Sequence, residues 1–147
     1  MTKKTPRSSA RGLSLIEIMV VMSIIGLLMA LVAPRFMGAR AKAERGSARA
    51  QIEMLGTALD TFRLDVGRYP STQEGLAALN QRPFGADRWD GPYLKKAVPL
   101  DPWGHAYNYR SPGDAGRPYD LFSYGSDGGP GGEGDGKDIT SWDSDRG

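Results

Sequence analysis

Oxygen-bearing side chains gather near the C-terminus, in a stretch that is also rich in glycine. The acidic residues there are Asp127, Glu133, Asp135, Asp138, Asp143 and Asp145. Calcium binds roughly six to eight hard oxygens, including carboxylates and backbone carbonyls, and glycines let a chain wrap so that its carbonyls point inward. No EF-hand pattern is present, because Asp127-Gly128-Gly129-Pro130 lacks the alternating acids. Glycine-rich acidic segments are also often solvated and disordered, so composition leaves a calcium loop and an acidic tail both open.

One carboxylate lies in the most apolar part of the chain. Residues 13–33 are long enough to cross a bilayer as a helix, and Glu17 is the only charged residue among them. A charge inside a membrane helix costs about 2.5–3.5 kcal/mol on insertion scales, so Glu17 needs a partner or a purpose. Three interpretations are open: a tolerated carboxylate near the lipid head groups, a mark for a processing enzyme, or in addition a charge that pairs between subunits.

A basic leader precedes the apolar stretch. Residues 1–12 contain no acid, so the positive-inside rule places them in the cytoplasm and the remaining chain across the membrane. Their basic residues are Lys3, Lys4, Arg7 and Arg11. The apolar stretch is too long for the core of a secretory signal peptide, and no small-residue cleavage site closes it before Pro34. Hydropathy alone fits a plain signal anchor, but cleavage between Gly12 and Leu13 would leave the helix in the product.

The composition excludes several classes of protein and site. The 147 residues contain no cysteine, so neither a disulfide framework nor a thiolate metal site can form. His105 is the only histidine, and no nucleophile with a paired base can be assembled around it, so catalysis is not expected. The net charge of +2 becomes −2 once the four basic residues of the leader are removed. No basic stripe interleaved with aromatics points to nucleic acid, and the three tryptophans are expected to anchor core or loops.

The apolar stretch should continue into a second, amphipathic half of the same helix. Apolar residues recur there at spacings of 3, 4, 3 and 4, which places them on one helical face. This stripe consists of Ile52, Leu55, Leu59, Phe62 and Val66. We expect one helix from Leu13 to about Leu64, with a kink or local unwinding at Pro34 and an end at residues 67–70. The second half must pack on a folded domain.

Short elements are expected after the long helix. Ser71 and Glu74 have the spacing of a capping box, so a short helix through Leu76 and Leu79 should follow. Residues 80–104 are rich in Gly and Pro and predict a loop region. The expected core anchors in this region are Trp89, Tyr93, Leu94 and Trp103.

Two segments further on have the pattern of strands. Residues 105–109 alternate between apolar and polar side chains, residues 119–124 look like a second strand, and the turn cluster 112–116 separates them. This arrangement predicts an antiparallel hairpin. With the long helix, the expected fold class is α+β.

Several of these motifs together resemble a known family. The basic leader, Gly12, the apolar helix and Glu17 are similar to the N-terminal signature of type IV pilins and pseudopilins. Residues 67–79, 101–104 and 119–128 resemble segments of the major pseudopilin family of type II secretion systems. The likeness covers nearly the whole chain. It implies an α+β, type IV pilin-like fold, in which a long N-terminal helix, transmembrane then amphipathic, packs on a small antiparallel sheet.

The resemblance also implies a division of the chain. Residues 1–12 would be a leader removed by prepilin peptidase, 13–33 a transmembrane and assembly helix, and 34–147 a periplasmic domain. In that domain, 34–66 would be the amphipathic half of the helix, and 67–147 the loops, sheet and C-terminal calcium loop. The protein would cross the inner membrane once, with a cytoplasmic N-terminus and a periplasmic C-terminal domain, before assembly into a periplasmic fibre.

The function implied by the family is structural and not enzymatic. Subunits cut after Gly12 and methylated on Leu13 would polymerise into a pseudopilus that pushes folded exoproteins through the outer-membrane secretin. Glu17 would neutralise the N-terminal amine of Leu13 in a neighbouring subunit, because an unpaired charge would stay desolvated. The implied partners are further copies of the chain, minor pseudopilins, the inner-membrane assembly platform, prepilin peptidase and, transiently, the secretin and exoproteins.

Two other functions remain open from the sequence. The chain could be a true type IV pilin subunit for adhesion, motility or DNA uptake, although many such pilins carry a C-terminal disulfide and this chain has no cysteine. A membrane-anchored periplasmic enzyme would need a nucleophile with a base or a metal with histidines, and a single histidine makes that a poor match.

The C-terminal loop of the family binds calcium, which favours the calcium interpretation of the acidic stretch. We predict one site between Tyr124 and Asp138. Asp127 and Asp135 are the expected side-chain ligands, Asp138 or Glu133 are further candidates, and the carbonyl of Tyr124 is the expected main-chain donor.

Overall fold

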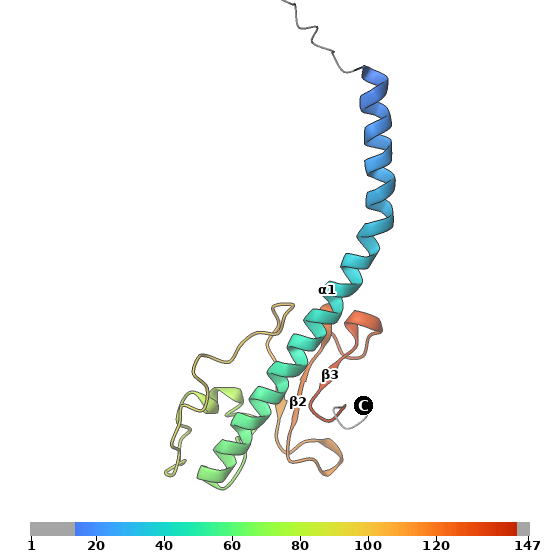
Figure 1. Cartoon of the computed structure of the whole chain (residues 1–147). Helices are drawn as coiled ribbons and strands as arrows, with labels where there is room; N and C mark the ends of the chain where they lie inside the picture. Colours follow the sequence, from blue (N-terminus) through green and yellow to red (C-terminus); the bar gives the residue numbers. More distant parts are fainter. Residues whose placement is uncertain (1–13, 144–147) are drawn as a thin grey trace, which may run out of the picture. The chain divides into compact units, whose positions relative to one another are not determined.

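The computed structural model describes residues 14–143, except for the side chains of residues 33–35 and 37. Contacts divide the chain into two compact units, Met1–Ala39 and Arg40–Gly147. The first unit contains the apolar half of the long helix, and the second contains its amphipathic half and all other elements (Figure 1). The division falls six residues beyond the expected end of the membrane segment.

Helix α1 runs from Leu15 to Val66 without a break. The expected local unwinding at Pro34 is not seen, because proline removes only one intrahelical hydrogen bond and the turns on both sides continue. The helix ends as predicted at Gly67, which has a φ of 88° and donates a 2.8 Å hydrogen bond to the carbonyl of Arg63. Glycine adopts this left-handed conformation without the strain of a Cβ.

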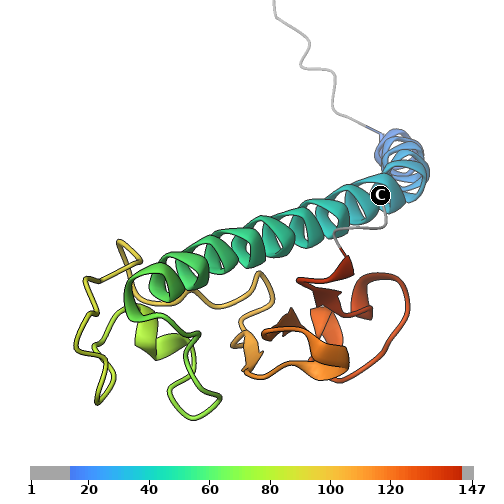
Figure 2. The same cartoon turned by 90° about the horizontal axis from the view of Figure 1, so that it is seen from below.

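Three short strands form an antiparallel sheet in the order β1-β2-β3. Strand β1 (Asn108–Arg110) pairs with β2 (Asp120–Ser123), and β2 pairs with β3 (Ile139–Thr140). The predicted hairpin is therefore confirmed, and β3 is an addition that the sequence did not predict. In the second unit, the amphipathic half of α1 lies alongside this sheet (Figures 1 and 2).

The first strand begins three residues later than expected. His105 belongs to a turn, in which its backbone N–H donates to Asp101 Oδ1 at 2.8 Å and its carbonyl accepts from the Asp101 N–H at 2.8 Å. These bonds tie up the backbone of His105, so it cannot join the ladder. The prediction of a strand from residue 105 was wrong for this reason.

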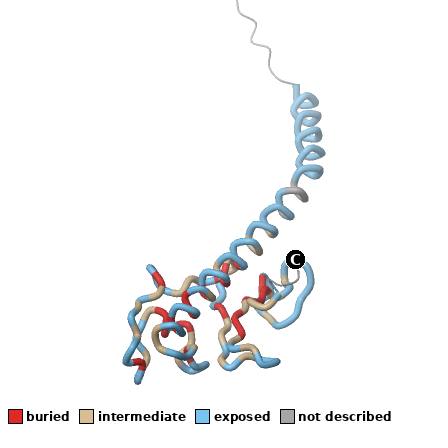
Figure 3. Tube along the Cα trace, turned by 60° about the horizontal axis from the view of Figure 1, so that its bottom comes forward, coloured by how far each residue is buried: buried red, intermediate tan, exposed pale blue. Residues whose placement is uncertain are grey.

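One apolar core lies between α1, the sheet and the loop region. Of the predicted helical stripe, Val66 is half-buried and the other four residues are buried, which confirms the amphipathic half of the helix (Figure 3). Leu121 and Ile139 reach this core from the sheet, and Leu79 and Leu94 from the loop region. The buried residues of this core cluster are Ala48, Ile52, Leu55, Ala58, Leu59, Phe62, Leu76, Ala78, Leu79, Leu94, Tyr107, Leu121 and Ile139.

The segment after α1 forms the expected capping box. The Ser71 N–H donates to Glu74 Oε2 at 2.7 Å, and the Glu74 N–H donates to Ser71 Oγ at 3.3 Å. The turn leads into the short 3₁₀ helix η1 (Leu76–Leu79) rather than an α-helix. Of the predicted anchors, Leu94 is buried, while Trp89, Tyr93 and Trp103 are half-buried against the core. Further 3₁₀ turns are η2 (Asp114–Gly116), η3 (Gly125–Asp127) and η4 (Gly134–Gly136).

Candidate functional site

The apolar half of α1 is exposed along its length. Leu15–Val32 is the one helix segment, among residues 14–143, that is long and apolar enough to cross a membrane. Its leucine, isoleucine, valine and methionine side chains are all exposed in the single chain (Figure 3). The hydroxyl of Ser23 donates to the carbonyl of Met19 at 2.8 Å, so this polar group needs no partner from lipid.

Glu17 lies in the first turn of this helix. The Ile18 N–H donates to the Ser14 carbonyl at 3.2 Å. The Glu17 side chain is exposed and lies in the first turn of α1, where the helix dipole favours a negative charge. Gly12 and Leu13, the expected cleavage site and mature end, lie outside the described residues.

The acidic loop 124–138 connects β2 to β3 and includes η3 and η4. Asp127 Oδ1 accepts a hydrogen bond from the Gly129 N–H at 3.2 Å. The two carboxylate oxygens of Asp138 accept from the Gly131 N–H at 3.2 and 3.1 Å, and the Asp138 N–H donates to the Gly131 carbonyl at 3.2 Å. Both carboxylates therefore organise the turns of the loop itself.

Oxygens from two parts of the loop approach one another beside Gly132. A Cβ on Gly132 would lie 2.3 Å from the carbonyl oxygen of Gly136 and 2.7 Å from Asp127 Oδ2. A Cβ on Gly136 would also lie 2.7 Å from Asp127 Oδ2. At Gly132 only glycine fits without a shift of the backbone, whereas at Gly136 a Cβ would displace the Asp127 side chain. The close approach brings a carboxylate and a carbonyl, two of the oxygen types that calcium binds, to the same place.

The other predicted ligands are more widely spread. Asp135 and Glu133 have exposed side chains, and the carbonyl of Tyr124 immediately precedes η3. Within residues 14–143 no three acidic, histidine or cysteine side chains gather closely enough to hold a metal ion. A cation in this loop would therefore rely on Asp127 and on backbone carbonyls, because the Asp138 carboxylate accepts from the Gly131 N–H.

The start of the acidic loop is held by a buried aspartate. Asp101 is 4% exposed. Its Oδ2 accepts a hydrogen bond from Ser123 Oγ at 2.6 Å, and Ser123 Oγ accepts from the Gly125 N–H at 3.1 Å. The His105 ring lies 3.8 Å from Asp101 through Nδ1 and would touch a Cβ on Gly128. The turn at residues 101–105 thus contacts the start of the acidic loop and fixes its position.

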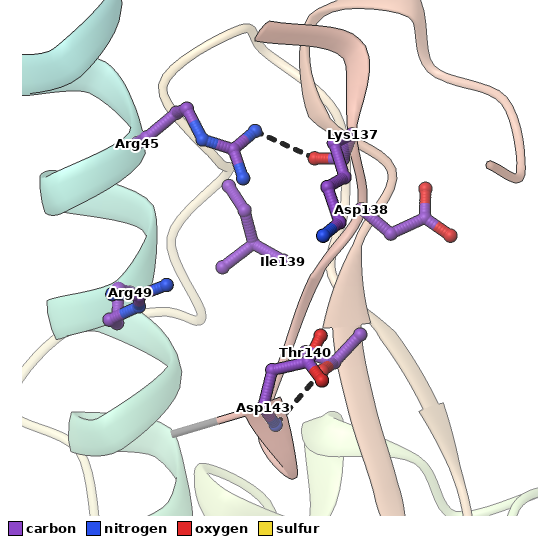
Figure 4. Close-up of a pocket in the computed structure, with 7 residues that line it drawn as sticks. All are labelled: Arg45, Arg49, Lys137, Asp138, Ile139, Thr140 and Asp143. Carbon is purple, nitrogen blue, oxygen red and sulfur yellow. Dashed lines mark hydrogen bonds between the residues drawn. The ribbon is translucent and has the colours of Figure 1, made fainter. Parts of the chain in front are cut away.

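The end of the acidic loop is held by helix α1. Arg45 donates a hydrogen bond of 2.7 Å to the main-chain oxygen of Lys137 (Figure 4). It also donates to that of Gly134 at 3.2 Å, with a longer contact of 3.5 Å to that of Asp135. Sequence reasoning missed this contact, because Arg45 is a single arginine in a mixed polar stretch and its acceptors are backbone atoms about ninety residues away.

A second buried carboxylate, also missed from the sequence, braces the β1–β2 hairpin. Asp120 is fully buried and accepts hydrogen bonds from Arg117 Nε at 2.7 Å, the Asp114 N–H at 2.9 Å and Arg110 at 2.6 Å. Burial alone would raise the pKa of Asp120. The hydrogen bonds from Arg117, Asp114 and Arg110 outweigh this effect and lower the pKa to about 2.

Comparison with known proteins fits these features. Residues 35–142 match the family model "Type II secretion system (T2SS), protein G", and residues 7–33 match the prokaryotic N-terminal methylation motif. The chain belongs to the type II secretion system protein G family. Core protein G of Pseudomonas aeruginosa is 46% identical over 94% of this chain and 99% of that protein. Core protein G of Xanthomonas campestris is 39% identical over 99% of this chain and 94% of that protein.

A solved structure supports the same assignment. The crystal structure of the major pseudopilin from the type 2 secretion system of enterohaemorrhagic Escherichia coli has a TM-score of 0.59 and 39% sequence identity. The match covers 72% of this chain and 92% of that chain. The expected type IV pilin-like fold is thus confirmed. The protein G family is structural, so the expectation that the chain is not an enzyme also holds, and a true type IV pilin is not favoured.

Membership of the protein G family has direct consequences for the N-terminal segment. The methylation motif covers residues 7–12 of the basic leader, Glu17 and the whole apolar stretch to residue 33. Together with the exposed apolar helix, it implies processing by a prepilin peptidase and assembly into a pseudopilus from the membrane.

Proposed function

We propose that the mature chain begins at Leu13, carries an N-methyl group there, and polymerises into a periplasmic pseudopilus. The observation that carries the proposal is the exposed apolar segment Leu15–Val32, which continues as one helix, α1, into the folded second unit. Such a segment needs lipid or other copies of itself to cover it. The subunit waits in the inner membrane with a cytoplasmic leader and a periplasmic domain.

Glu17 fixes the register of neighbouring subunits in this proposal. After cleavage, the amine of Leu13 is a positive charge four positions before Glu17 in sequence. In this proposal, the Leu13 amine does not pair with Glu17 of its own helix. The Leu13 amine of a neighbouring copy pairs with Glu17 instead. An unpaired charge in hydrocarbon is strongly unfavourable, so subunits favour the one axial offset that pairs Glu17 with an amine.

The fibre acts by moving proteins across the outer membrane. In this proposal, added subunits lengthen the pseudopilus against folded exoproteins and push them through the secretin. The chain itself contacts other copies, minor pseudopilins and the inner-membrane assembly platform. It does not act on nucleic acid.

Mass spectrometry of the chain from cells with and without prepilin peptidase tests the proposed processing. We expect the mature mass to fit a chain starting at Leu13 with one added methyl group, and the full-length mass in cells without the peptidase. Gly12→Val should block the cut, because a Cβ crowds the scissile bond, whereas Ser9→Val in the same leader should not. A mature chain that keeps Met1, or begins beyond Ala33, would contradict the proposal.

We also propose that the acidic loop binds one calcium ion when the domain is folded. Support comes from the approach of Asp127 Oδ2 and the Gly136 carbonyl beside Gly132 and from the absence of any disulfide that could fix the loop. Asp127 is the principal carboxylate, and Asp138, Asp135 and the carbonyl of Tyr124 are the further ligands. A bound calcium supplies charge that draws these oxygens together.

Calorimetry with the purified chain tests calcium binding. We expect one calcium ion per chain and loss of binding in the presence of a chelator. Asp127→Asn should bind calcium more weakly while keeping the wild-type fold. A heat of binding that is unchanged in Asp127→Asn would place the ion elsewhere.

A further inference from the structure

Arg45 gathers main-chain oxygens from three residues of the acidic loop. Its acceptors are the carbonyls of Gly134, Asp135 and Lys137. Figure 4 shows the bond to Lys137, which Arg45 reaches from helix α1. The guanidinium is charged at all relevant pH values, and all three contacts come from its Nη1. A single side-chain cation therefore holds this segment of the loop.

The carbonyl of Gly136 is not among these acceptors. It lies beside Asp127 Oδ2, and both oxygens surround the position that a Cβ on Gly132 would take. The segment 134–137 thus presents oxygens to two places. Three of its carbonyls serve Arg45, and the fourth lies next to the carboxylate that we propose as the principal calcium ligand.

We propose that Arg45 is the positioning residue of the calcium loop. It fixes segment 134–137 on α1 before any cation arrives, so that the Gly136 carbonyl already lies beside Asp127. The inference rests on the calcium binding proposed above, but its first consequence concerns the loop without calcium and is measured in that state.

The physical reason is preorganisation. A loop rich in glycine loses much conformational entropy when it is ordered, and no disulfide shares that cost. If Arg45 orders residues 134–137 during folding, calcium has to order only the remaining part of the loop, and it binds more tightly. Without Arg45, the whole cost falls on calcium binding.

Arg49 provides a matched control. It lies one helical turn after Arg45 and lines the same cavity, of about 260 Å³, beside Lys137 and Asp143 (Figure 4). Within residues 14–143, no hydrogen bond or ion pair is found for its guanidinium. Replacing Arg49 therefore removes the same charge from the same face of α1 without releasing the loop.

The test compares Arg45→Met, Arg45→Lys and Arg49→Met in the full-length chain in detergent micelles. Hydrogen exchange of the amides of residues 131–138 is measured in chelator, and calcium binding is measured by calorimetry. For Arg45→Met we expect exchange at least about tenfold faster in chelator and a calcium Kd at least about tenfold higher. Arg45→Lys should fall between Arg45→Met and wild type, because lysine keeps the positive charge, but its shorter side chain places the ammonium short of the position that Arg45 Nη1 takes. Arg49→Met should stay within about twofold of wild type.

The amides of α1 around Leu55 report whether each variant is folded. If these amides lose protection in Arg45→Met, that variant is unfolded. The loop exchange and calcium Kd of Arg45→Lys, compared with those of Arg49→Met, then decide whether Arg45 positions the loop. Equal loop exchange in wild type, Arg45→Lys and Arg45→Met in chelator would overturn the role of Arg45. A wild-type chain that binds no calcium would instead refute the calcium site, and faster exchange in Arg45→Met would then still support its hold on the loop.

Discussion

Ser123 Oγ donates a 2.6 Å hydrogen bond to Oδ2 of Asp101, and both residues are buried. This bond joins the turn at residues 101–105 to the last residue of β2, from which the acidic loop begins. Because Ser123 Oγ also accepts from the Gly125 N–H at 3.1 Å, the hydroxyl sits at the centre of a buried chain of three groups.

Ser123→Ala should destabilise the domain by about 1–3 kcal/mol, because it leaves a buried carboxylate oxygen and a buried N–H without a partner. Ser126→Ala, at an exposed serine three residues further on, should change stability by less than about 0.5 kcal/mol. Denaturant unfolding of both variants measures the difference. Equal effects would mean that the buried hydroxyl contributes nothing beyond its volume.

The domain should lose stability in acid. The pKa of Asp120 is lowered to about 2 in the folded protein, from an ordinary value of 3.8. Hydrogen bonds from Arg68 lower the pKa of Glu74 to about 2, from 4.5. A depressed pKa stabilises the folded state above the unfolded pKa, and this contribution is lost as pH falls toward the folded pKa. The melting temperature should therefore drop between about pH 4.5 and pH 2.

Asp120→Asn should cost about 3 kcal/mol at neutral pH, because it leaves two arginines facing a neutral group. The cost lies at the low end for a buried pair, since Arg110 and Arg117 remain 47% and 30% exposed. The variant should also lose part of the acid dependence, which thermal melts at several pH values would measure. A variant with the full wild-type pH dependence would show that other carboxylates control acid unfolding.

The helical stripe makes a prediction about packing. Leu59→Ala should cost about 2–5 kcal/mol, because Leu59 is fully buried in the core. Leu64→Ala on the same helix should cost less than about 0.5 kcal/mol, because Leu64 is 78% exposed. Denaturant unfolding of residues 42–147 without the apolar segment would measure both, and would also check that this part folds alone. Similar costs for the two variants would contradict the assigned orientation of the helix.

Calcium should raise the stability of the wild-type chain and not that of Asp127→Ala. Binding to the folded state alone contributes about 2.7 kcal/mol at a hundredfold excess over Kd. Melting temperatures in calcium and in chelator should therefore differ for the wild type and nearly coincide for Asp127→Ala. Asp143→Ala, outside the loop, is the control and should keep the wild-type difference. If the wild type melts at the same temperature in both buffers, the loop does not bind calcium.

The long helix and its partner hairpin could be predicted because their patterns are local. The stripe from Ile52 to Phe62 repeats with the helical period, and Gly67 marks the end. Strand β3 escaped prediction because two residues after a glycine-rich loop carry no periodic signal. Its place is set by pairing with β2, and only the folded chain reveals that pairing.

The residues proposed to have a function divide in the same way. Glu17 stands out in the sequence because a lone charge in an apolar stretch is costly. Arg45 and Asp101 do not stand out, because their partners are backbone atoms or residues far along the chain. Asp127 could be proposed from composition, but its approach to Gly136 depends on how the loop closes. Sequence patterns identify a residue such as Glu17, whose charge is unusual for its surroundings. Only the fold shows that common polar residues such as Arg45 and Asp101 hold the acidic loop.

The central claim is that Glu17 makes this chain a fibre subunit, and imaging of fibres tests it most directly. Cells that carry the secretion system and overproduce the chain are compared with cells that produce Glu17→Ala or Ser23→Ala at equal membrane levels. Glu17→Ala should insert normally, since it removes a charge from the span, but form no fibres, while Ser23→Ala should form them. Wild-type numbers of fibres from Glu17→Ala would contradict the account.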